Sequence, residues 1–130
     1  MVLSGKKWLL WCNKQRKMKT CSNPLCPLTQ ALTVIGGKWK PVIIYQLYRS
    51  SKRFGQLDVA IPGISRKVLT SQLNELLSDQ LISRQAYNES PPRVEYQLTD
   101  KGKELIPIFS SIADWGGYLV EEYKLDLAKG

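Results

Sequence analysis

The sequence predicts a single, mainly helical α+β domain in which short helices precede a two-stranded hairpin and a long final helix. Its 130 residues match the usual size of one domain. Its composition, 43% hydrophobic and 23% charged, is that of a globular chain that buries one core without disulfides or metals. Apolar residues recur at helical spacing along most of the chain and alternate with polar residues near residues 94–98. Together these observations indicate the fold class.

Positive charge is concentrated toward the start and middle of the chain. Residues 1–20 contain six Lys or Arg and no acid, residues 38–93 contain nine against four acids, and residues 94–130 contain four against seven acids. The middle of the chain can therefore face a polyanion, whereas the C-terminal part repels one. We expect residues 1–20 to be a basic extension, either a flexible tail or leader or a short amphipathic helix on a surface, and residues 21–130 to form the domain.

The cysteine content and the apolar pattern favour a reducing, cytoplasmic location. The three cysteines all lie in the first fifth of the chain, an odd number without the spacing of a secreted disulfide framework. No apolar run approaches the length of a membrane span, so we expect no membrane partner. Histidine is absent and the cysteines lack paired metal-ligand spacing. We therefore expect no metal and no cofactor.

Short helices are expected before the turn at residues 61–64. The first begins after Pro27 and ends at Gly36-Gly37, because glycine commonly ends a helix. The second runs from about Trp39 to Tyr48 and tolerates a proline in its first turn. Residues 50–53 form a turn, and a third helix follows over residues 54–61. The first helix carries its apolar residues on one face, namely Leu28, Ala31, Leu32 and Ile35. Those of the second suit burial on more than one side, namely Val42, Ile43, Ile44, Leu47 and Tyr48. The third has Phe54, Leu57 and Ile61 on one face.

The helix expected from Arg66 to Gln80 has well-separated polar and apolar faces. Ser65 precedes it as a good N-cap, because a serine hydroxyl can accept a hydrogen bond from an exposed amide of the first turn. The polar face is basic in its first two turns, and the acids Glu75 and Asp79 come only later. The apolar stripe consists of Val68, Leu69, Leu73, Leu76 and Leu77, and the polar side of Arg66, Lys67, Thr70, Ser71, Asn74 and Ser78.

A hairpin and a long helix complete the chain. Residues 81–87 and 94–98 form the strands, and alternation in the second strand indicates one buried face and one exposed face. Thr99 caps the final helix, which we expect to break near Pro107. Its apolar residues exceed what the core of a small domain needs, so they indicate a homodimer surface, shared with the first helix. These residues are Leu105, Ile106, Ile108, Phe109, Ile112, Trp115, Leu119 and Val120.

This order of elements is that of a winged helix-turn-helix, in which one helix enters the major groove of DNA and the hairpin is the wing. We expect Arg93, at the tip of the hairpin loop, to reach the adjacent minor groove, where the negative potential attracts arginine. Lys38 is a candidate phosphate contact. The helical periodicity of these polar residues alone fits an ordinary solvated face as well as it fits a DNA-binding face. The candidate DNA-binding residues are Ser65, Arg66, Lys67, Thr70, Ser71, Asn74, Arg93 and Lys38.

Short motifs follow one another in unbroken order over residues 25–117. They are Cys26-Pro27, Gly36-Gly37-Lys38-Trp39, Arg53-Phe54, Ile61-Pro-Gly-Ile-Ser65, Leu73 with Glu75-Leu76, Pro92-Arg-Val-Glu-Tyr96, and Leu98-Thr99 with Gly102. This set resembles the HxlR-type regulators, a branch of winged helix proteins related to MarR regulators. The resemblance implies a dimeric bacterial transcription factor, and many such factors respond to electrophiles, quinones or oxidants. It also favours DNA contact over an ordinary solvated face.

The resemblance further implies a redox role for Cys26. In redox-sensing members a cysteine just before the first helix is the sensor, and Cys26 occupies that position, whereas Cys12 and Cys21 lie outside the shared pattern. A helix N-terminus and nearby basic residues favour a thiolate. Cys21 is a candidate resolving thiol. The alternative is that Cys26 is a small buried hydrophobic residue without redox function.

The sequence thus predicts a sequence-specific regulator that binds an inverted repeat in double-stranded DNA as a homodimer and responds to redox or electrophile stress. One alternative is a winged-helix regulator without thiol sensing, controlled by a small ligand or by abundance. Another is a winged helix that binds proteins, or binds nucleic acid without sequence preference. Paired carboxylates, a phosphate-binding glycine loop and a nucleophile motif are all absent from the sequence, so we expect no enzyme.

Overall fold

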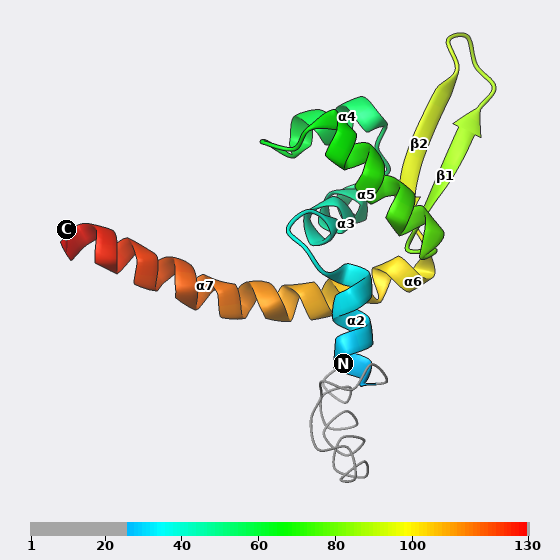
Figure 1. Ribbon diagram of the computed structural model, residues 1–130. Coiled ribbons are helices and arrows are strands. Elements are labelled where there is room, and N and C mark those ends of the chain that lie inside the picture. Colours follow the sequence, from blue (N-terminus) through cyan, green and yellow to red (C-terminus); the bar gives the residue numbers. More distant parts are fainter. Residues whose placement is uncertain (1–25, 130) are drawn as a thin grey trace. The chain divides into compact units, whose positions relative to one another are not determined.

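The computed structural model describes residues 26–129, which fall into two units divided between Gly36 and Gly37. The mainly helical α+β prediction, with a two-stranded wing and a long C-terminal helix, is confirmed. The boundary expected between residues 20 and 21 lies outside the described residues. The elements are α2 (Pro27–Ile35) in the first unit, and α3 (Lys40–Arg49), α4 (Phe54–Ala60), α5 (Arg66–Ser78), β1 (Ile82–Tyr87), β2 (Arg93–Leu98), α6 (Asp100–Lys103) and α7 (Leu105–Lys129) in the second (Figure 1).

Helix α2 begins one residue earlier than expected, at Pro27 itself. Proline suits this position because an amide in the first turn has no partner within the helix. Cys26 is the N-cap, and its carbonyl accepts a hydrogen bond from Gln30 N at 3.0 Å. Gly36 follows the last helical residue, as predicted. Leu28 and Leu32 are 44% and 53% exposed, so α2 keeps apolar surface in contact with water.

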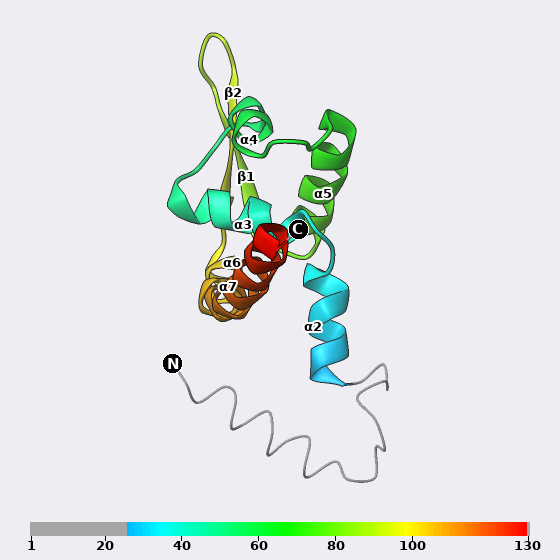
Figure 2. The ribbon, with the colours of Figure 1, turned by 90° about the vertical axis from the view of Figure 1, so that its left-hand side faces the viewer.

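The core of the second unit lies between α3, α4, α5 and the hairpin. Helix α3 packs against β2 and α4, and α5 packs against β1. The tip of the hairpin projects beyond α4 in both Figure 1 and Figure 2. The wing therefore stands next to the helices of the helix-turn-helix. The side chains that are fully buried here are Ile43, Ile44, Leu57, Ile61, Leu69, Leu73, Leu76 and Ile82.

Two apolar residues of α3 lie outside the core, contrary to prediction. Val42 is 38% exposed and Tyr48 is 55% exposed. The core side of the helix is a single stripe formed by Ile43, Ile44 and Leu47, all buried. A helix at the surface of a small domain buries one stripe, so apolar residues outside that stripe remain in water.

The ends of the later elements differ from prediction by one or two residues. Helix α5 ends at Ser78, because Gln80 has a φ of 60° and cannot continue a right-handed helix. The amide of Leu81 then donates to Leu76 O at 3.0 Å, which satisfies a carbonyl at the end of the helix. As a result β1 starts at Ile82, and β2 starts one residue earlier than expected, at Arg93.

The two strands of the wing are antiparallel, with Ile82 opposite Leu98 at one end and Tyr87 opposite Arg93 at the other. Lys52 forms an additional bridge to Tyr96: its amide donates to Tyr96 O at 3.0 Å, and its carbonyl accepts from Tyr96 N at 2.8 Å. The predicted turn over residues 50–53 therefore also lies along the sheet. A bridge of a single residue leaves no alternation of polar and apolar residues, so the sequence does not indicate this bridge.

Thr99 caps the start of α6, as predicted, by accepting a hydrogen bond from Gly102 N at 3.1 Å. The helical segment breaks at Glu104 and restarts as α7, with Pro107 in its first turn, which confirms the expected break. Helix α7 packs against α3 and α6. It nevertheless has no buried residue over its 25 residues.

Gly102 lies where α6 approaches the backbone of Leu81, and a Cβ at this position would overlap Leu81 O. That oxygen accepts from Thr99 N at 3.2 Å, so it cannot move without loss of a hydrogen bond. We expect Gly102→Ala to lower the free energy of unfolding by about 3 kcal/mol, measured by urea denaturation. Gly55→Ala is the matched control, because a Cβ there meets nothing within 4 Å. An unchanged urea midpoint for Gly102→Ala would contradict this packing.

Candidate nucleic-acid interface

The first two turns of α5 present a polar, basic surface. Ser65 and Arg66, Lys67, Thr70, Ser71 and Asn74 form this α5 surface, and all of them are exposed. The Ser65 hydroxyl accepts a hydrogen bond from Val68 N at 3.2 Å, which confirms the predicted N-cap. The first turn of the helix contains no acid. The structure thus brings together the candidate residues that the sequence placed on this helix.

The opposite face of α5 anchors the helix in the core. Leu69, Leu73 and Leu76 are buried. Glu75 pairs with Lys40 of α3 at 2.6 Å between Oε2 and Nζ, and the Lys40 side chain is 9% exposed. This pair ties α5 to α3 and neutralises the first acid of the helix. The α5 surface is therefore displayed by a rigid support.

The side chains of the α5 surface differ in their existing contacts. Arg66 Nε donates to Asp58 Oδ2 of α4 at 3.2 Å. The Thr70 hydroxyl donates to Arg66 O at 2.8 Å, which leaves its oxygen able to accept. Within residues 26–129, the side chains of Lys67, Ser71 and Asn74 make no hydrogen bond or ion pair. These three are therefore available to a ligand.

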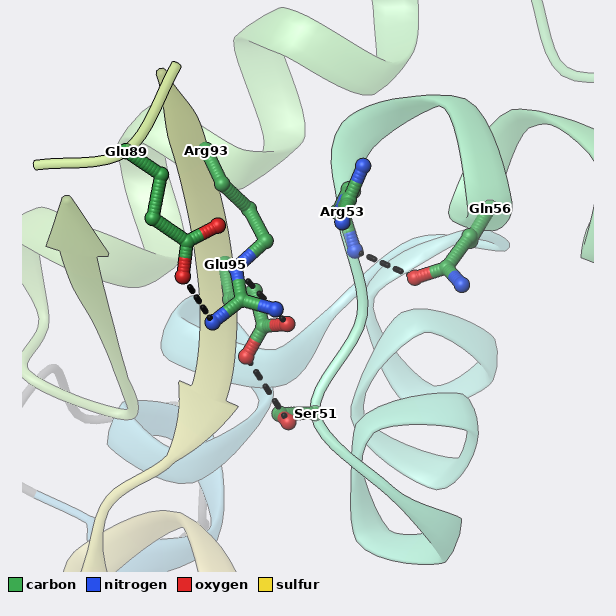
Figure 3. Close-up of polar contacts among 6 residues, drawn as sticks. All are labelled: Ser51, Arg53, Gln56, Glu89, Arg93 and Glu95. Carbon is green, nitrogen blue, oxygen red and sulfur yellow. Dashed lines mark hydrogen bonds and ion pairs between the residues drawn. The ribbon is translucent and has the colours of Figure 1, made fainter. Parts of the chain in front are cut away.

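Arg93 is the first residue of β2 and not the tip of the loop, contrary to prediction. Its Nη2 lies 3.1 Å from Glu89 Oε1, and its Nε lies 3.7 Å from Glu95 Oε1 (Figure 3). Its guanidinium carbon is 4.1 Å from the centroid of the Tyr87 ring. Glu95 also accepts from the Ser51 hydroxyl at 3.3 Å. The strand pairing continues one residue further than expected, and this holds the arginine on the sheet.

Lys38 lies just before α3 and is exposed. Its Nζ is 4.7 Å from the centroid of the Trp39 ring, a cation–π distance. Trp39 is half-buried and is the N-cap of α3. The tryptophan thus has a structural position, and the lysine beside it keeps its charge at the surface.

Residues 34–124 match the family described as HxlR-like helix-turn-helix. The match extends from the end of α2 into the last turns of α7. The chain belongs to this family. Among its relatives, the HTH-type transcriptional regulator YdeP of Bacillus subtilis (strain 168) is 42% identical over 99 residues, which are 76% of this chain and 74% of that protein.

Solved structures also resemble this HxlR-like chain. A transcriptional regulator of the MarR family from Porphyromonas gingivalis W83 gives a TM-score of 0.70 at 42% identity, covering 75% of this chain and 95% of that one. The redox regulator HypR in its oxidized form gives a TM-score of 0.68 at 41% identity, covering 72% and 96%. These similarities confirm the family and the winged-helix fold that the motifs implied.

Cys26 of this HxlR-like protein is the N-cap of α2 and is 3% exposed. Its place at the start of the helix agrees with the prediction, and its side chain is buried. Cys12 and Cys21 lie outside the described residues. Among residues 26–129, no group of three or more His, Cys, Asp or Glu is arranged to hold a metal ion. None of the helices described there combines the length and apolar character needed to cross a membrane.

Two features of this HxlR-like surface were not predicted from the sequence. Asp58 contacts Arg66 across a turn, eight residues apart, and no helical period connects the two positions. Arg93 pairs with Glu95 because residues two apart on a strand point to the same face, and it meets Glu89 because β2 begins at Arg93, directly after the short loop. The three residues are neighbours in the sequence, which is a signal of proximity but not of contact.

Proposed function

We propose that this protein is a sequence-specific DNA-binding transcriptional regulator that binds inverted repeats in double-stranded DNA as a homodimer. The α5 surface carries the proposal, because it is an N-capped helix whose exposed first turns are polar, basic and without acids. Membership of the HxlR-like family and a relative that is an HTH-type transcriptional regulator support it. The protein acts in the cytoplasm by binding, without catalysing a reaction and without a cofactor.

The α5 surface suits the major groove of B-form DNA, which is wide enough for one helix. With the start of α5 directed into the groove, Arg66 and Lys67 reach base edges or phosphates first. Ser71 follows about one turn later and Asn74 about two turns later, and both can donate to or accept from bases or the backbone. The proposed contacts of this helix are Ser65, Arg66, Lys67, Thr70, Ser71 and Asn74.

Two basic residues outside α5 extend the proposed interface. Lys38 contacts a phosphate, since its ammonium is exposed. Arg93 reaches the adjacent minor groove when its guanidinium exchanges Glu89 for DNA. The Glu89 side chain is 52% exposed, so water weakens this ion pair, while Glu95 and the Tyr87 ring keep the rest of the guanidinium in place during the exchange. The negative potential of a narrow minor groove then attracts the arginine.

Helix α7 supplies the proposed dimer surface. Ile108, Ile112, Trp115 and Leu119 recur at helical spacing along one side and are between 48% and 64% exposed. A continuous apolar stripe in water indicates a partner surface. Two leucines of α2 are exposed as well and form a second apolar patch. A two-fold dimer presents two α5 helices to two half-sites related by the same symmetry.

Selection from a pool of random duplexes tests this function. We expect enrichment of an inverted repeat whose half-site centres are about 34–36 Å apart, one helical turn. Affinity for the selected duplex should exceed that for a random duplex of equal length by about 10³-fold or more at physiological salt. Equal affinity for both duplexes would instead identify a nucleic-acid binder without sequence preference.

A thiol switch at Cys26 is a second candidate function, favoured by the place of Cys26 at the start of α2 and by the similarity to the redox regulator HypR. We infer that an oxidant joins Cys26 to Cys21 of the same chain, or to Cys21 or Cys26 of a second subunit. Two thiols then become one disulfide, and two electrons and two protons pass to the oxidant. The start of α2 shifts, and the change in dimer geometry alters the spacing of the two reading helices.

We expect wild-type protein to release its operator after treatment with diamide, and Cys26→Ser to retain it, as measured by fluorescence anisotropy. Reduction by dithiothreitol should restore wild-type binding. Cys12→Ser is the matched control and should behave as wild type, and a non-reducing gel separates a disulfide between subunits from one within a chain. Continued binding by oxidised wild type would favour control by a small ligand or by abundance.

A further inference from the structure

Asp58 holds the arginine at the start of α5 in one orientation. Arg66 Nε donates to Asp58 Oδ2 at 3.2 Å, and the side chains are 79% and 23% exposed, respectively. The backbone that carries Asp58 is fixed, because Leu57 next to it on α4 and Ile61 at the end of this helix are both buried in the core. Gln56 also closes the start of α4 by accepting a hydrogen bond from Arg53 N at 2.8 Å (Figure 3).

The contact engages only one edge of the guanidinium. An arginine has five N–H donors in a planar fork, and Nε supplies one of them. Within residues 26–129, the Nη1 and Nη2 atoms of Arg66 have no hydrogen-bond or ion-pair partner. The pair of donors that can bind the O6 and N7 atoms of a guanine is thus unoccupied, while the orientation of its plane is already restrained.

The Arg66–Asp58 ion pair is too weak to be explained by a contribution to folding stability. An ion pair with a largely exposed arginine adds little to folding stability, because water screens the attraction and the side chains lose conformational freedom. Asp58 also places a negative charge beside a surface proposed to approach phosphates. A carboxylate there weakens sequence-independent binding, so a benefit must come from directed contact by Arg66.

We propose that Asp58 is a positioning residue that presents the two Nη groups of Arg66 to a guanine and thereby sets sequence specificity. The proposal rests on the proposed function of the α5 surface and adds the means by which one of its residues discriminates bases. Orienting the guanidinium before binding reduces the conformational freedom lost on contact. This orientation strengthens binding only to operators with the matching base pair, whereas the negative charge of Asp58 weakens binding to all DNA sequences alike.

Removal of the carboxylate should therefore affect specific and non-specific binding in opposite directions. For Asp58→Ala we expect weaker binding to the selected operator and unchanged or stronger binding to a random duplex of equal length. The ratio of the two affinities should fall by about three- to tenfold, a part of the discrimination that one bidentate contact provides. Asp58→Asn keeps an oxygen that accepts from Nε, so it should largely preserve the ratio while strengthening binding to both duplexes.

A double-mutant cycle with Arg66 gives the decisive readout. Operators with each base pair replaced in turn should show that Asp58→Ala relaxes discrimination at the same position as Arg66→Ala. In an Arg66→Ala background, Asp58→Ala should leave discrimination unchanged, because the two residues act as one unit. Asp58→Leu is a second variant without an acceptor, and it carries the test if thermal denaturation shows that the alanine variant is poorly folded.

The outcomes separate this proposal from the function on which it rests. If Arg66→Ala relaxes discrimination and Asp58→Ala does not, positioning by Asp58 is wrong while reading by α5 stands. If Asp58→Ala strengthens binding to operator and random duplex equally, Asp58 is only a charge that opposes DNA. If neither Arg66→Ala nor Lys67→Ala changes binding to any duplex, α5 is not the reader, and both proposals fail.

Discussion

Ile112→Glu and Trp115→Glu are expected to yield folded monomers that have lost most of their affinity for the operator. The two side chains are 51% and 64% exposed on α7 and do not contribute to a core. A charge at either position therefore leaves the fold intact but opposes burial against a second copy. Because both half-sites must be engaged together, loss of the dimer should lower operator affinity by about 10²- to 10⁴-fold.

Sedimentation equilibrium at micromolar concentration and anisotropy with labelled operator measure the two effects. Ser110→Glu is the matched control, because Ser110 is exposed and lies on the side of α7 away from Ile112. This variant should remain dimeric and bind as wild type. A wild-type protein that sediments as a monomer at micromolar concentration would show that α7 is not a dimer surface.

Arg66→Ala is expected to have the second largest effect. A bidentate contact to guanine contributes about 1–3 kcal/mol, so operator affinity should fall by about 5- to 150-fold, with relaxed discrimination at one base pair in each half-site. Lys67→Ala provides the comparison: if Lys67 contacts a phosphate, binding should weaken alike for all sequences, and the salt dependence should become less steep. Both residues are exposed, so neither substitution should alter folding.

The control for lost positive charge is Lys103→Ala, which removes an exposed lysine of α6, outside the α5 surface. It should leave operator discrimination as in wild type, whereas Arg66→Ala should not. Titration of operators with single base-pair replacements measures the discrimination of each variant. An Arg66→Ala protein that weakens binding equally for every replaced operator would assign Arg66 to the phosphate backbone.

Local features of the candidate site could be predicted because they depend on residues close together in the sequence. Ser65 caps α5 through an amide three residues away, and the stripe of Leu69, Leu73 and Leu76 follows the helical period. The exposed apolar residues of α7 could likewise be predicted, because the sequence of this helix contains more apolar residues than the core of a small domain needs. In each case the physical cause acts within one or a few turns of helix.

Contacts across turns and strands could not be predicted in this way. The bridge between Lys52 and Tyr96 joins a predicted turn to the wing, although 44 residues separate the two positions. Val42 and Tyr48 are apolar at helical positions, yet only the packing of α3 shows that they lie outside the core. Such outcomes depend on which side of an element meets its neighbours, and composition does not specify that side.

The sequence by itself determined the order of the elements, the cap of α5 and the residues that form its polar surface, since these follow from capping and periodicity. The tertiary structure alone decided the charge partners on that surface. Arg66 meets Asp58 because the turn between α4 and α5 brings the start of α5 beside α4, and Arg93 meets Glu89 because the hairpin loop folds back at the start of β2. Neither turn geometry has a periodic signal in the sequence, so these ion pairs become visible only when the chain is folded.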